Sequence, residues 1–470
     1  MRIVLVNPTL KEAPSFGLLY LCSILEHKGH KVIIVEFEDG ADNSHLFEKI
    51  CEFNPNIIGF TVMSYQLNQV REIIKGLPKT FLIAGGRHAT ALPSEVLDMG
   101  FDLVVRGEAE ESLPEILDLI VKGEEHKISE VKGVVLKKDG VLIDTGIRDP
   151  PDITKLPWPA YDKIDINKYL ESKIYGIRGK WLRTGWVFTS RGCPGRCTFC
   201  YNNLFFCNKY RVRDIDDVIS EIKFLKKTYN IEALWVLDDT FTLSESRVIE
   251  FCEKLKRENL GLKLDAQTRV NTFTEKMAIA MKDAGFVQVE FGVESGSQKV
   301  LDGYKKGTSV EQIKKAFEIA HKYGFTTFAN FIVGAPNETL EDIEMTKHLI
   351  KEIKPTTVGV SFLTAYPGTE LYDMAKENGW LNKGSFFLHT SDKPQLTIHF
   401  SEDELKSIRN DIYSLSMGKT AFLFLKEVGF WKDMVKITLR NPLFPLRISY
   451  LLLKGDSVNA INKFKEEMVR

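Results

Sequence analysis

The chain has 470 residues, of which 44% are hydrophobic and 27% charged, and this composition is typical of a soluble globular protein with room for more than one domain. Its formal net charge of −1 supplies no general attraction for nucleic acid, so we expect no nucleic-acid partner. No apolar run reaches the roughly 18 residues that a membrane-spanning helix needs. Seven cysteines without a preceding targeting segment favour a reducing compartment, so we expect a cytoplasmic protein.

Residues 1–130 alternate short β-branched runs with amphipathic segments, which predicts a doubly wound, Rossmann-like parallel sheet. Ligands of such sheets bind at the carboxyl ends of the strands. The five runs are residues 3–6, 32–35, 57–60, 81–84 and 103–105. Polar residues or glycines follow these runs at Asn7, Thr61, Ser64, Gly85, Gly86, His88 and Glu108. We therefore expect a ligand slot at this edge of the sheet.

Residues 131–180 predict a connector between two domains. Residues 133–136 and 141–143 flank Asp139-Gly140, a dipeptide typical of a β-hairpin. A proline-rich stretch at 150–159 follows, and prolines at this density favour an extended linker.

Residues 181–380 repeat the alternation of strands and helices over longer units. Strand-like runs lie near Val187 and at residues 233–237, 262–266, 287–291, 326–333 and 357–362. Six such units predict a partial (β/α)6 barrel of the TIM type, with its chemistry at the carboxyl ends of the strands. Residues 381–470 read as a helical C-terminal region.

Three cysteines, Cys193, Cys197 and Cys200, stand on a loop that leaves the first strand of the second half. Three thiolates cannot ligate every iron of a [4Fe–4S] cluster, so one iron would stay open to a small molecule. A zinc site is the alternative, but structural zinc takes four ligands and no second Cys/His pair lies nearby. A disulfide is disfavoured by the odd number of thiols.

The CxxxCxxC spacing, with Phe199 before the third cysteine, resembles the signature of the radical S-adenosylmethionine (SAM) enzymes. The resemblance implies that the three cysteines hold a [4Fe–4S] cluster, that the open iron chelates SAM, and that the backbone of Phe199 lies near the adenine. It further implies SAM contacts at the later strand ends. Their candidates are Asp238 and Asp239 for the amino group, Arg269 for the carboxylate, Gln267 on the same strand end, Glu294 and Ser295 near the ribose and carboxylate, and Gly334 and Pro336 near the adenine.

The first 130 residues resemble the cobalamin-binding domain that precedes the radical SAM domain in one large subgroup. Thr61, Ser64, Gly85 and Gly86 match the slot for the nucleotide tail of cobalamin, and Asn7 and Glu108 stand at neighbouring strand ends. The Asp-x-His-x-x-Gly motif that places a histidine on cobalt is missing after the first strand. We therefore expect cobalamin without a protein histidine on cobalt. His88 could face the corrin, although a loop histidine is more often a hydrogen-bonding residue.

The resemblance implies an enzyme in which a 5′-deoxyadenosyl radical takes hydrogen from an unactivated carbon, followed by methyl transfer from methylcobalamin. A cyclase, rearrangement or oxygen-insertion enzyme with the same cofactors is the first alternative. A methylthiotransferase is disfavoured because only Cys22 and Cys51 precede the connector, too few for a second cluster. A non-catalytic cobalamin sensor would leave the three thiols without a role.

The substrate cannot be named from the sequence, and a small molecule or a lipid-like compound is expected, with flavodoxin or ferredoxin as electron donor. Tyr366 follows the sixth strand and is a catalytic candidate facing the substrate, with a buried core aromatic as the alternative. Aromatic and basic residues interleave in the C-terminal region, which could lie on a membrane, although we favour a helical cap on the barrel. They are Phe422, Phe424, Lys426, Phe430, Trp431, Lys432, Lys436, Arg440, Phe444, Arg447, Tyr450 and Lys454.

Overall fold

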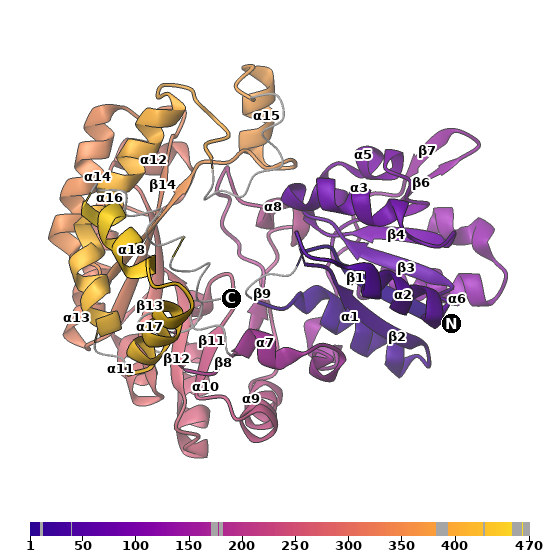
Figure 1. The fold of residues 1–470 in the computed structure, drawn as a ribbon, viewed down its shortest axis with the longest axis horizontal. Coiled ribbons are helices and arrows are strands. Elements are labelled where there is room, and N and C mark those ends of the chain that lie inside the picture. Colours follow the sequence, from indigo (N-terminus) through magenta and orange to yellow (C-terminus); the bar gives the residue numbers. More distant parts are fainter. Residues whose placement is uncertain are drawn as a thin grey trace. The chain divides into compact units, whose positions relative to one another are not determined.

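The computed structural model describes residues 1–9, 13–38, 40–170, 177, 182–381, 393–425, 428–453 and 463, and it describes the backbone without side chains at 417–425, 428–430, 433, 452 and 453. The chain forms two compact units (Figure 1). Unit 1 comprises Met1–Tyr169, Gly192–Val212 and Ala365–His389, and unit 2 comprises Leu170–Arg191, Arg213–Thr364 and Thr390–Arg470. The loop with the three cysteines therefore belongs to unit 1, although the strands before and after it belong to unit 2.

Unit 1 contains a seven-stranded sheet in the order β2-β1-β3-β4-β5-β6-β7. Strands β1 to β5 are parallel to one another, β6 runs antiparallel to β5, and β7 runs antiparallel to β6. The strands are β1 (Arg2–Asn7), β2 (Lys31–Glu36), β3 (Ile57–Thr61), β4 (Phe81–Gly85), β5 (Leu103–Val105), β6 (Val134–Lys138) and β7 (Val141–Asp144), with the short β10 (Arg211–Val212) outside the sheet. The helices are α1 (Phe16–His27), α2 (Ser44–Phe53), α3 (Leu67–Lys75), α4 (Arg87–Ala91), α5 (Pro93–Asp98), α6 (Ser112–Val121), α7 (Ile166–Leu170), α8 (Asn202–Phe205) and α15 (Glu370–Glu377).

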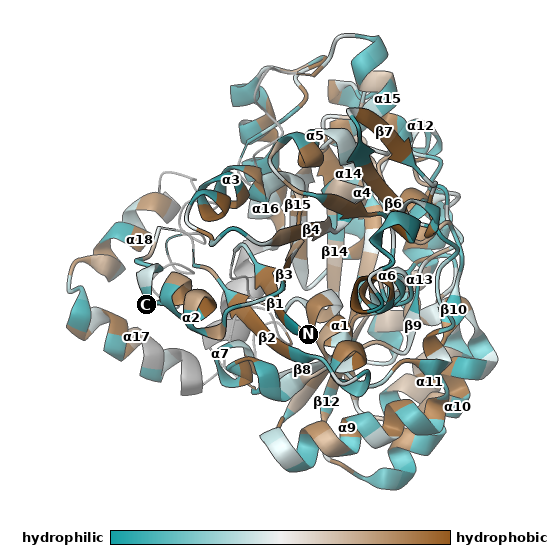
Figure 2. Ribbon diagram, turned by 90° about the vertical axis from the view of Figure 1, so that its right-hand side faces the viewer, coloured by the Kyte–Doolittle hydropathy of each residue, from teal (hydrophilic) through white to brown (hydrophobic). Residues whose placement is uncertain are grey.

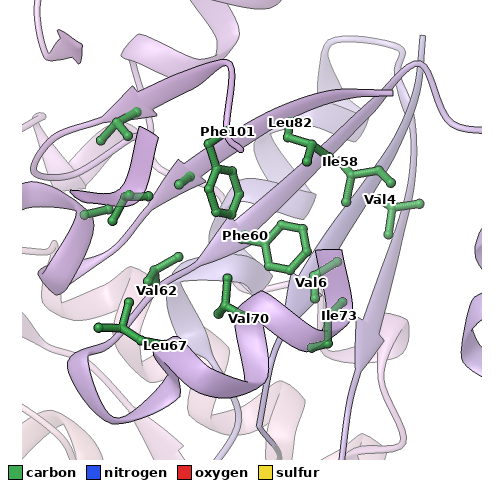
Figure 3. Packing of buried hydrophobic residues seen from close by; sticks show 14 of the residues in the cluster. Val4, Val6, Ile58, Phe60, Val62, Leu67, Val70, Ile73, Leu82 and Phe101 are labelled. Atoms are coloured by element: carbon green, nitrogen blue, oxygen red, sulfur yellow. The ribbon is translucent and has the colours of Figure 1, made fainter. Parts of the chain in front are cut away.

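The core of unit 1 shows why its strands read as continuous apolar runs. Alternate side chains of β1, β3 and β4 face helices α2, α3 and α5, where Val6, Phe60 and Val70 pack together with Phe101 (Figure 3). The intervening side chains, such as Ile3 and Leu5, are also buried. A sheet covered on both faces needs apolar residues at every position. The order of strands reverses between β1 and β3, which places a topological switch point at Asn7 and Thr61.

The segment expected to be a connector packs on unit 1 instead. Strand β6 pairs with β5, so the hairpin extends the parallel sheet. The proline-rich stretch forms two short 3-10 turns, Ile153–Lys155 and Tyr161–Lys163. Tyr161 is buried against Phe16 on α1, and the N–H of Ala160 donates to the carbonyl of Leu19 at 3.1 Å. Prolines excluded regular structure here, but they did not prevent the segment from packing.

Unit 2 contains a six-stranded, fully parallel sheet in the order β15-β14-β13-β12-β11-β8. Strands that follow one another along the chain are therefore neighbours, as in a partial (β/α)6 barrel. The strands are β8 (Thr184–Val187), β11 (Ala233–Val236), β12 (Lys263–Arg269), β13 (Phe286–Glu294), β14 (Thr326–Val333) and β15 (Thr357–Phe362), with the short β9 (Ser190–Arg191) after β8. These elements and unit 1 confirm the predicted fold class.

The barrel helices of unit 2 are amphipathic, and five of them begin at side-chain caps. Figure 2 shows hydrophobic and hydrophilic residues side by side on α10, whereas β3 and β4 of unit 1 are hydrophobic along their length. Asp214, Ser244, Thr274, Ser309 and Thr339 each accept a hydrogen bond from the backbone N–H three residues on. The helices are α9 (Ile215–Tyr229), α10 (Glu245–Glu258), α11 (Glu275–Asp283), α12 (Gln298–Gly303), α13 (Val310–Lys322) and α14 (Leu340–Ile353).

The described part of the C-terminal region contains the helices α16 (Glu402–Leu425), α17 (Val428–Arg440) and α18 (Phe444–Leu453). Helix α16 packs on β15 and α14, which agrees with a helical cap on the barrel. It continues without interruption through residues 415–420. Among the described helices, none is long and apolar enough to cross a membrane. The side chains of Phe422, Phe424, Lys426, Phe430 and Lys454 lie outside the described residues.

Candidate active site

The three cysteines of the CxxxCxxC sequence lie on one tightly bonded loop of unit 1. Cys193 and Cys197 are buried, and Cys200 is half-buried. The N–H of Cys200 donates to the carbonyl of Cys197 at 3.0 Å, and the Gly195 N–H lies 3.4 Å from the Cys193 sulfur. The Asn203 amide donates to the Cys197 carbonyl at 3.1 Å. The loop is therefore folded around its thiols by its own backbone.

The donor set of this loop fits a cluster with one open iron. Within the described residues, no three His, Cys, Asp or Glu side chains lie close enough to hold a single metal ion. In a [4Fe–4S] cluster each thiolate binds a different iron, so three thiols spread along a loop are the ligands it needs. All seven cysteines are thiols, and burial raises the pKa of Cys207, which lies near the end of the loop. Of the other cysteines, Cys22 and Cys252 are buried and Cys51 is exposed.

Tyr201, directly after Cys200, connects the cysteine loop to the strand ends of the Rossmann-like sheet. Its hydroxyl lies 3.4 Å from the Ser64 hydroxyl, and the Arg87 guanidinium lies 5.6 Å from the centre of its ring. The ring of Tyr366 lies 4.8 Å from that of Tyr201 at 35°. Burial raises the pKa of Tyr201, so the phenol stays protonated. Aromatic stacking and a cation over the ring together fix this side chain.

Ser64, His88 and Glu95 form a polar chain under the predicted cobalamin slot. The Ser64 hydroxyl lies 2.9 Å from Nδ1 of His88, and Nε2 of His88 lies 3.4 Å from a carboxylate oxygen of Glu95. Ser64 and His88 are both buried. The hydrogen bond from His88 lowers the pKa of Glu95. Nδ1 of His88 thus bonds to Ser64 and its Nε2 faces Glu95, and the expectation that His88 is not a cobalt ligand stays a prediction.

Gly85 and Gly86 differ in whether the structure leaves room for a side chain. Gly86 has φ of 99°, and a Cβ built there would lie 2.8 Å from both the nitrogen and the oxygen of Val62. A Cβ on Gly85 would meet only ordinary contacts, the nearest at 3.7 Å. Gly86 is therefore needed for the approach of two strand-end loops of the protein itself, one of which carries Thr61. Gly85 remains available to a ligand in our proposal.

Asn7 and Glu108 each bind another protein group. The Asn7 amide donates to Glu36 at 3.3 Å, at the switch point of the sheet. Glu108 is buried and accepts from Arg211 of the cysteine loop at 2.5 Å. Arg211 also donates to the carbonyl of Pro151 at 2.9 Å. Glu108, predicted as a cobalamin contact, therefore also anchors the loop that carries the thiols.

At the end of β11 the two adjacent acids have different environments. Asp238 is fully buried, and its carboxylate accepts four hydrogen bonds, from the backbone N–H groups of Thr189 (2.6 Å) and Ser190 (3.0 Å) and from their hydroxyls (2.5 Å and 2.6 Å). These bonds fill the acceptor sites of the carboxylate. Asp239 is half-buried. The predicted contact with the amino group of SAM therefore stays with Asp239 in our proposal.

An ion pair that the sequence did not indicate joins the end of β13 to the segment after helix Gln298–Gly303. Lys306 and Glu294 are both buried, and their charged atoms lie 2.6 Å apart. Glu294 has φ of 65°, an uncommon backbone conformation for a residue other than glycine. Arg269 donates to the Lys306 carbonyl and, at 3.4 Å, to Asn271. Gln267 is half-buried on the same face of β12 as Arg269.

Two further residues predicted to contact SAM, Ser295 and Pro336, bond to other groups of the protein. Ser295 is fully buried, and its hydroxyl lies 3.3 Å from that of Thr346. After β14, the buried carboxylate of Glu338 accepts from the N–H groups of Gly334 (2.7 Å) and Ala335 (3.3 Å). Burial raises the pKa of Glu338 to about 7. His399 lies 2.6 Å from the carbonyl of Pro336.

The structure thus groups the predicted residues into two sets. Unit 1 brings the cysteine loop, Tyr366 and the strand ends of the Rossmann-like sheet together, and unit 2 gathers the acids, amides and arginine at the carboxyl edge of the parallel sheet. Tyr201, Arg211, Lys306 and Glu338 were missed as site residues. Glu338 and Tyr201 could have been found from their places inside or beside a motif. Lys306 and Arg211 carried no such signal, because their partners are distant in sequence or in different elements.

Comparison with known families agrees with this arrangement. Residues 187–350 match the radical SAM superfamily, and residues 2–117 match the B12-binding domain family. The first match runs from the end of β8 through β14 and includes the cysteine loop, and the second covers β1 to β5 of unit 1. The fold and the thiols therefore define a radical SAM enzyme with a cobalamin-binding domain.

Individual proteins show the same likeness. The chain is 32% identical over 435 residues to a protein of Pyrococcus horikoshii named as an uncharacterised methyltransferase, with 88% of this chain and 92% of that protein covered. It is 28% identical over 402 residues to the anaerobic magnesium-protoporphyrin IX monomethyl ester cyclase of Rubrivivax gelatinosus, with 79% and 69% covered. Its fold resembles that of the radical SAM methyltransferase TsrM of Kitasatospora setae, with a TM-score of 0.70, 21% identity, and 81% and 76% covered.

The chain belongs to the radical SAM enzymes that carry an N-terminal B12-binding domain. The prediction of this family is confirmed, and with it the predicted cofactors, a [4Fe–4S] cluster, SAM and cobalamin.

Proposed function

We propose that the protein transfers a methyl group to an unactivated carbon of a small-molecule substrate. The observation that carries the proposal lies in unit 1, where Tyr201, next to the third cysteine, reaches Ser64 at the strand ends of the B12-binding sheet at 3.4 Å. The protein thereby couples the loop for radical chemistry to the slot for a methyl carrier. The name of the Pyrococcus relative supports the same reaction.

When bound, the cluster and SAM supply a radical that takes hydrogen from the substrate, and cobalamin supplies the methyl group. The residues of this chain bind and orient these groups. Cys193, Cys197 and Cys200 would hold the cluster, with the backbone of Phe199 beside SAM. Asp239, Gln267, Arg269 and Glu294 supply the polar groups for SAM, and Thr61, Ser64 and Gly85 line the cobalamin slot. Tyr366 is the proposed substrate contact.

Two measurements test the proposal. Iron, sulfide and cobalamin are measured on anaerobically reconstituted protein and on the Cys193→Ala/Cys197→Ala/Cys200→Ala variant. We expect the variant to lose its iron and to keep its cobalamin. Turnover with methyl-labelled SAM is then followed by product analysis. Label in a carbon–methyl group of the product supports the proposal, and turnover that forms 5′-deoxyadenosine with an unlabelled product contradicts it.

A ring-forming reaction without methyl transfer is the second candidate. The relative from Rubrivivax gelatinosus, which is named as a cyclase, favours it. The labelling experiment separates the two, because a cyclase would consume SAM as a source of radicals without incorporating its methyl carbon.

The substrate class, the electron donor and the domain boundaries also belong to this proposal. We infer a small flavodoxin or ferredoxin as electron donor, and domains at residues 1–130, 181–380 and 381–470, with the hairpin and proline-rich stretch of residues 131–180 between the first two. Exposed apolar side chains on α17, on α18 and between these helices, including Leu439 (78%) and Leu443 (70%), support a lipid-like substrate and contact with a membrane surface. Liposome flotation tests this contact, and protein that stays in the soluble fraction would contradict it.

A further inference from the structure

The chain enters the cysteine loop through Phe188, Thr189 and Ser190 and leaves it at Arg213, and all four residues belong to unit 2. The two segments meet at the base of the loop, where the N–H of Arg213 donates to the carbonyl of Thr189 at 2.9 Å. Asp238 holds the entering segment with the four hydrogen bonds described above. The N–H and O–H groups of Thr189 and Ser190 at the base of the loop therefore donate to a single carboxylate.

Two arginine side chains donate hydrogen bonds to backbone carbonyls at the same base of the loop. The Arg247 guanidinium donates to the carbonyl of Thr189 at 3.1 Å and to that of Arg213 at 2.7 Å, so one side chain binds both segments. The Arg213 guanidinium donates to the carbonyl of Phe188 at 2.9 Å and to the buried carboxylate of Glu221 at 2.5 Å. Arg213 itself is buried. We call Asp238, Arg213 and Arg247 the loop clamp.

The bonds of the loop clamp are of the strong kind. Each involves a charged group, and such hydrogen bonds are roughly twice as strong as those between neutral groups. Asp238 is fully enclosed, which raises the pKa of its carboxyl, and its four donors compensate for that burial. Donors left without an acceptor in the interior are costly. Movement of Thr189 or Ser190 would therefore break several bonds at once, only three residues before Cys193.

We propose that the loop clamp positions the cysteine loop for its cluster, with Asp238 as the principal positioning residue. Asp238 acts through Thr189 and Ser190 and needs no contact with SAM. The clamp fixes where both ends of the loop begin, so the thiols are placed before the cluster is assembled and held after it. The inference rests on the proposed function, because it takes Cys193, Cys197 and Cys200 as cluster ligands.

The test compares cluster retention with cobalamin retention in Asp238→Asn, Asp238→Ala, Ser190→Ala and the control Asp216→Asn. Asp216 lies on α9, is exposed, and pairs only with the surface residue Lys254 in the bonds described for it. Asparagine keeps the shape of Asp238 and an oxygen for the two backbone N–H groups, but it removes the charge. Each variant is reconstituted anaerobically. Iron release to a ferrous chelator, the electron paramagnetic resonance spectrum of the reduced cluster, cobalamin content and circular dichroism are then measured.

We expect Asp238→Asn and Ser190→Ala to release iron about fivefold faster or more, as the loss of about 1 kcal/mol implies, with an altered spectrum and unchanged cobalamin content. Asp216→Asn should match the wild type. Unchanged iron release and spectra in Asp238→Asn and Ser190→Ala would overturn the loop clamp, even if Asp238→Ala failed to fold. If wild type held no more iron than the triple cysteine variant, the proposed function would fail and the clamp with it.

Discussion

Nδ1 of His88 lies 2.9 Å from the hydroxyl of Ser64, and both side chains are buried although 24 residues separate them. The bond joins the short 3-10 turn after β3 to helix α4 after β4, the two segments predicted to line the cobalamin slot. Ser64→Ala should weaken cobalamin binding about five- to tenfold, since one buried hydrogen bond contributes about 1 kcal/mol. Equilibrium dialysis with hydroxocobalamin measures this, with the exposed Ser44→Ala as control. Equal affinities for the two variants would remove Ser64 from the slot.

Gly85→Ala and Gly86→Ala should separate packing from ligand binding. Gly86→Ala forces a Cβ against Val62 at positive φ and should lower the free energy of unfolding by about 2 kcal/mol or more. Gly85→Ala meets no such contact, so it should fold normally and weaken cobalamin binding. Thermal unfolding and cobalamin dialysis check both. Equal losses of stability in the two variants would contradict the difference between these glycines.

The ion pair between Glu108 and Arg211 should hold the cysteine loop on unit 1. Its side chains are 3% and 14% exposed, and breaking one partner of such a pair typically costs about 3–5 kcal/mol. Glu108→Gln should therefore speed proteolysis within residues 192–212. The neighbouring pair of Lys209 and Asp149 is exposed, so Asp149→Asn should have little effect. Mass spectrometry of limited digests identifies the cleavage sites, and a digestion rate of Glu108→Gln equal to that of Asp149→Asn would refute this anchor.

Lys306 should matter for SAM binding although no motif marked it. Lys306→Met removes the cation that pairs with the buried Glu294 carboxylate, and the loop after β13 should no longer hold its shape. We expect at least about tenfold weaker binding of labelled SAM to reconstituted protein, whereas Lys305→Met, on the adjacent exposed side chain, should bind normally. A lower melting temperature with unchanged SAM affinity would mean that the pair serves stability alone.

Glu338 should make stability fall as the pH rises. Its pKa is raised from 4.5 to about 7, so the folded state binds a proton that the unfolded state releases between these values. The stabilising contribution is complete below pH 4.5 and is lost as the pH passes 7, which amounts to at most about 3 kcal/mol. Glu338→Gln should gain stability relative to wild type between pH 5 and 8.

Melting curves at four pH values in the triple cysteine background measure this difference without interference from the cluster. The exposed Glu311→Gln should show no such trend relative to wild type. A difference between Glu338→Gln and wild type that does not change with pH would contradict the raised pKa.

The sequence by itself determined the elements and the cluster motif, because both depend on local spacing. Periods of two and 3.6 residues in the apolar pattern mark strands and helices, and the distances between three cysteines along a loop limit what they can hold. The strand runs at 57–60 and 326–333 are close to the observed β3 and β14. Parallel strands place their carboxyl ends at one edge of their sheet. The sequence therefore also predicted that Thr61 lies at this edge of the first sheet and Arg269 at this edge of the second.

Only the tertiary structure decided which polar groups are already bonded within the protein. Asp238 and Asp239 are adjacent in sequence, yet one has all its acceptor sites filled by Thr189 and Ser190 and the other is half-buried. Lys306 pairs with Glu294 because the segment after α12 folds against the end of β13. Burial and hydrogen-bond partners are set by packing between distant segments, which leaves no periodic trace in the chain.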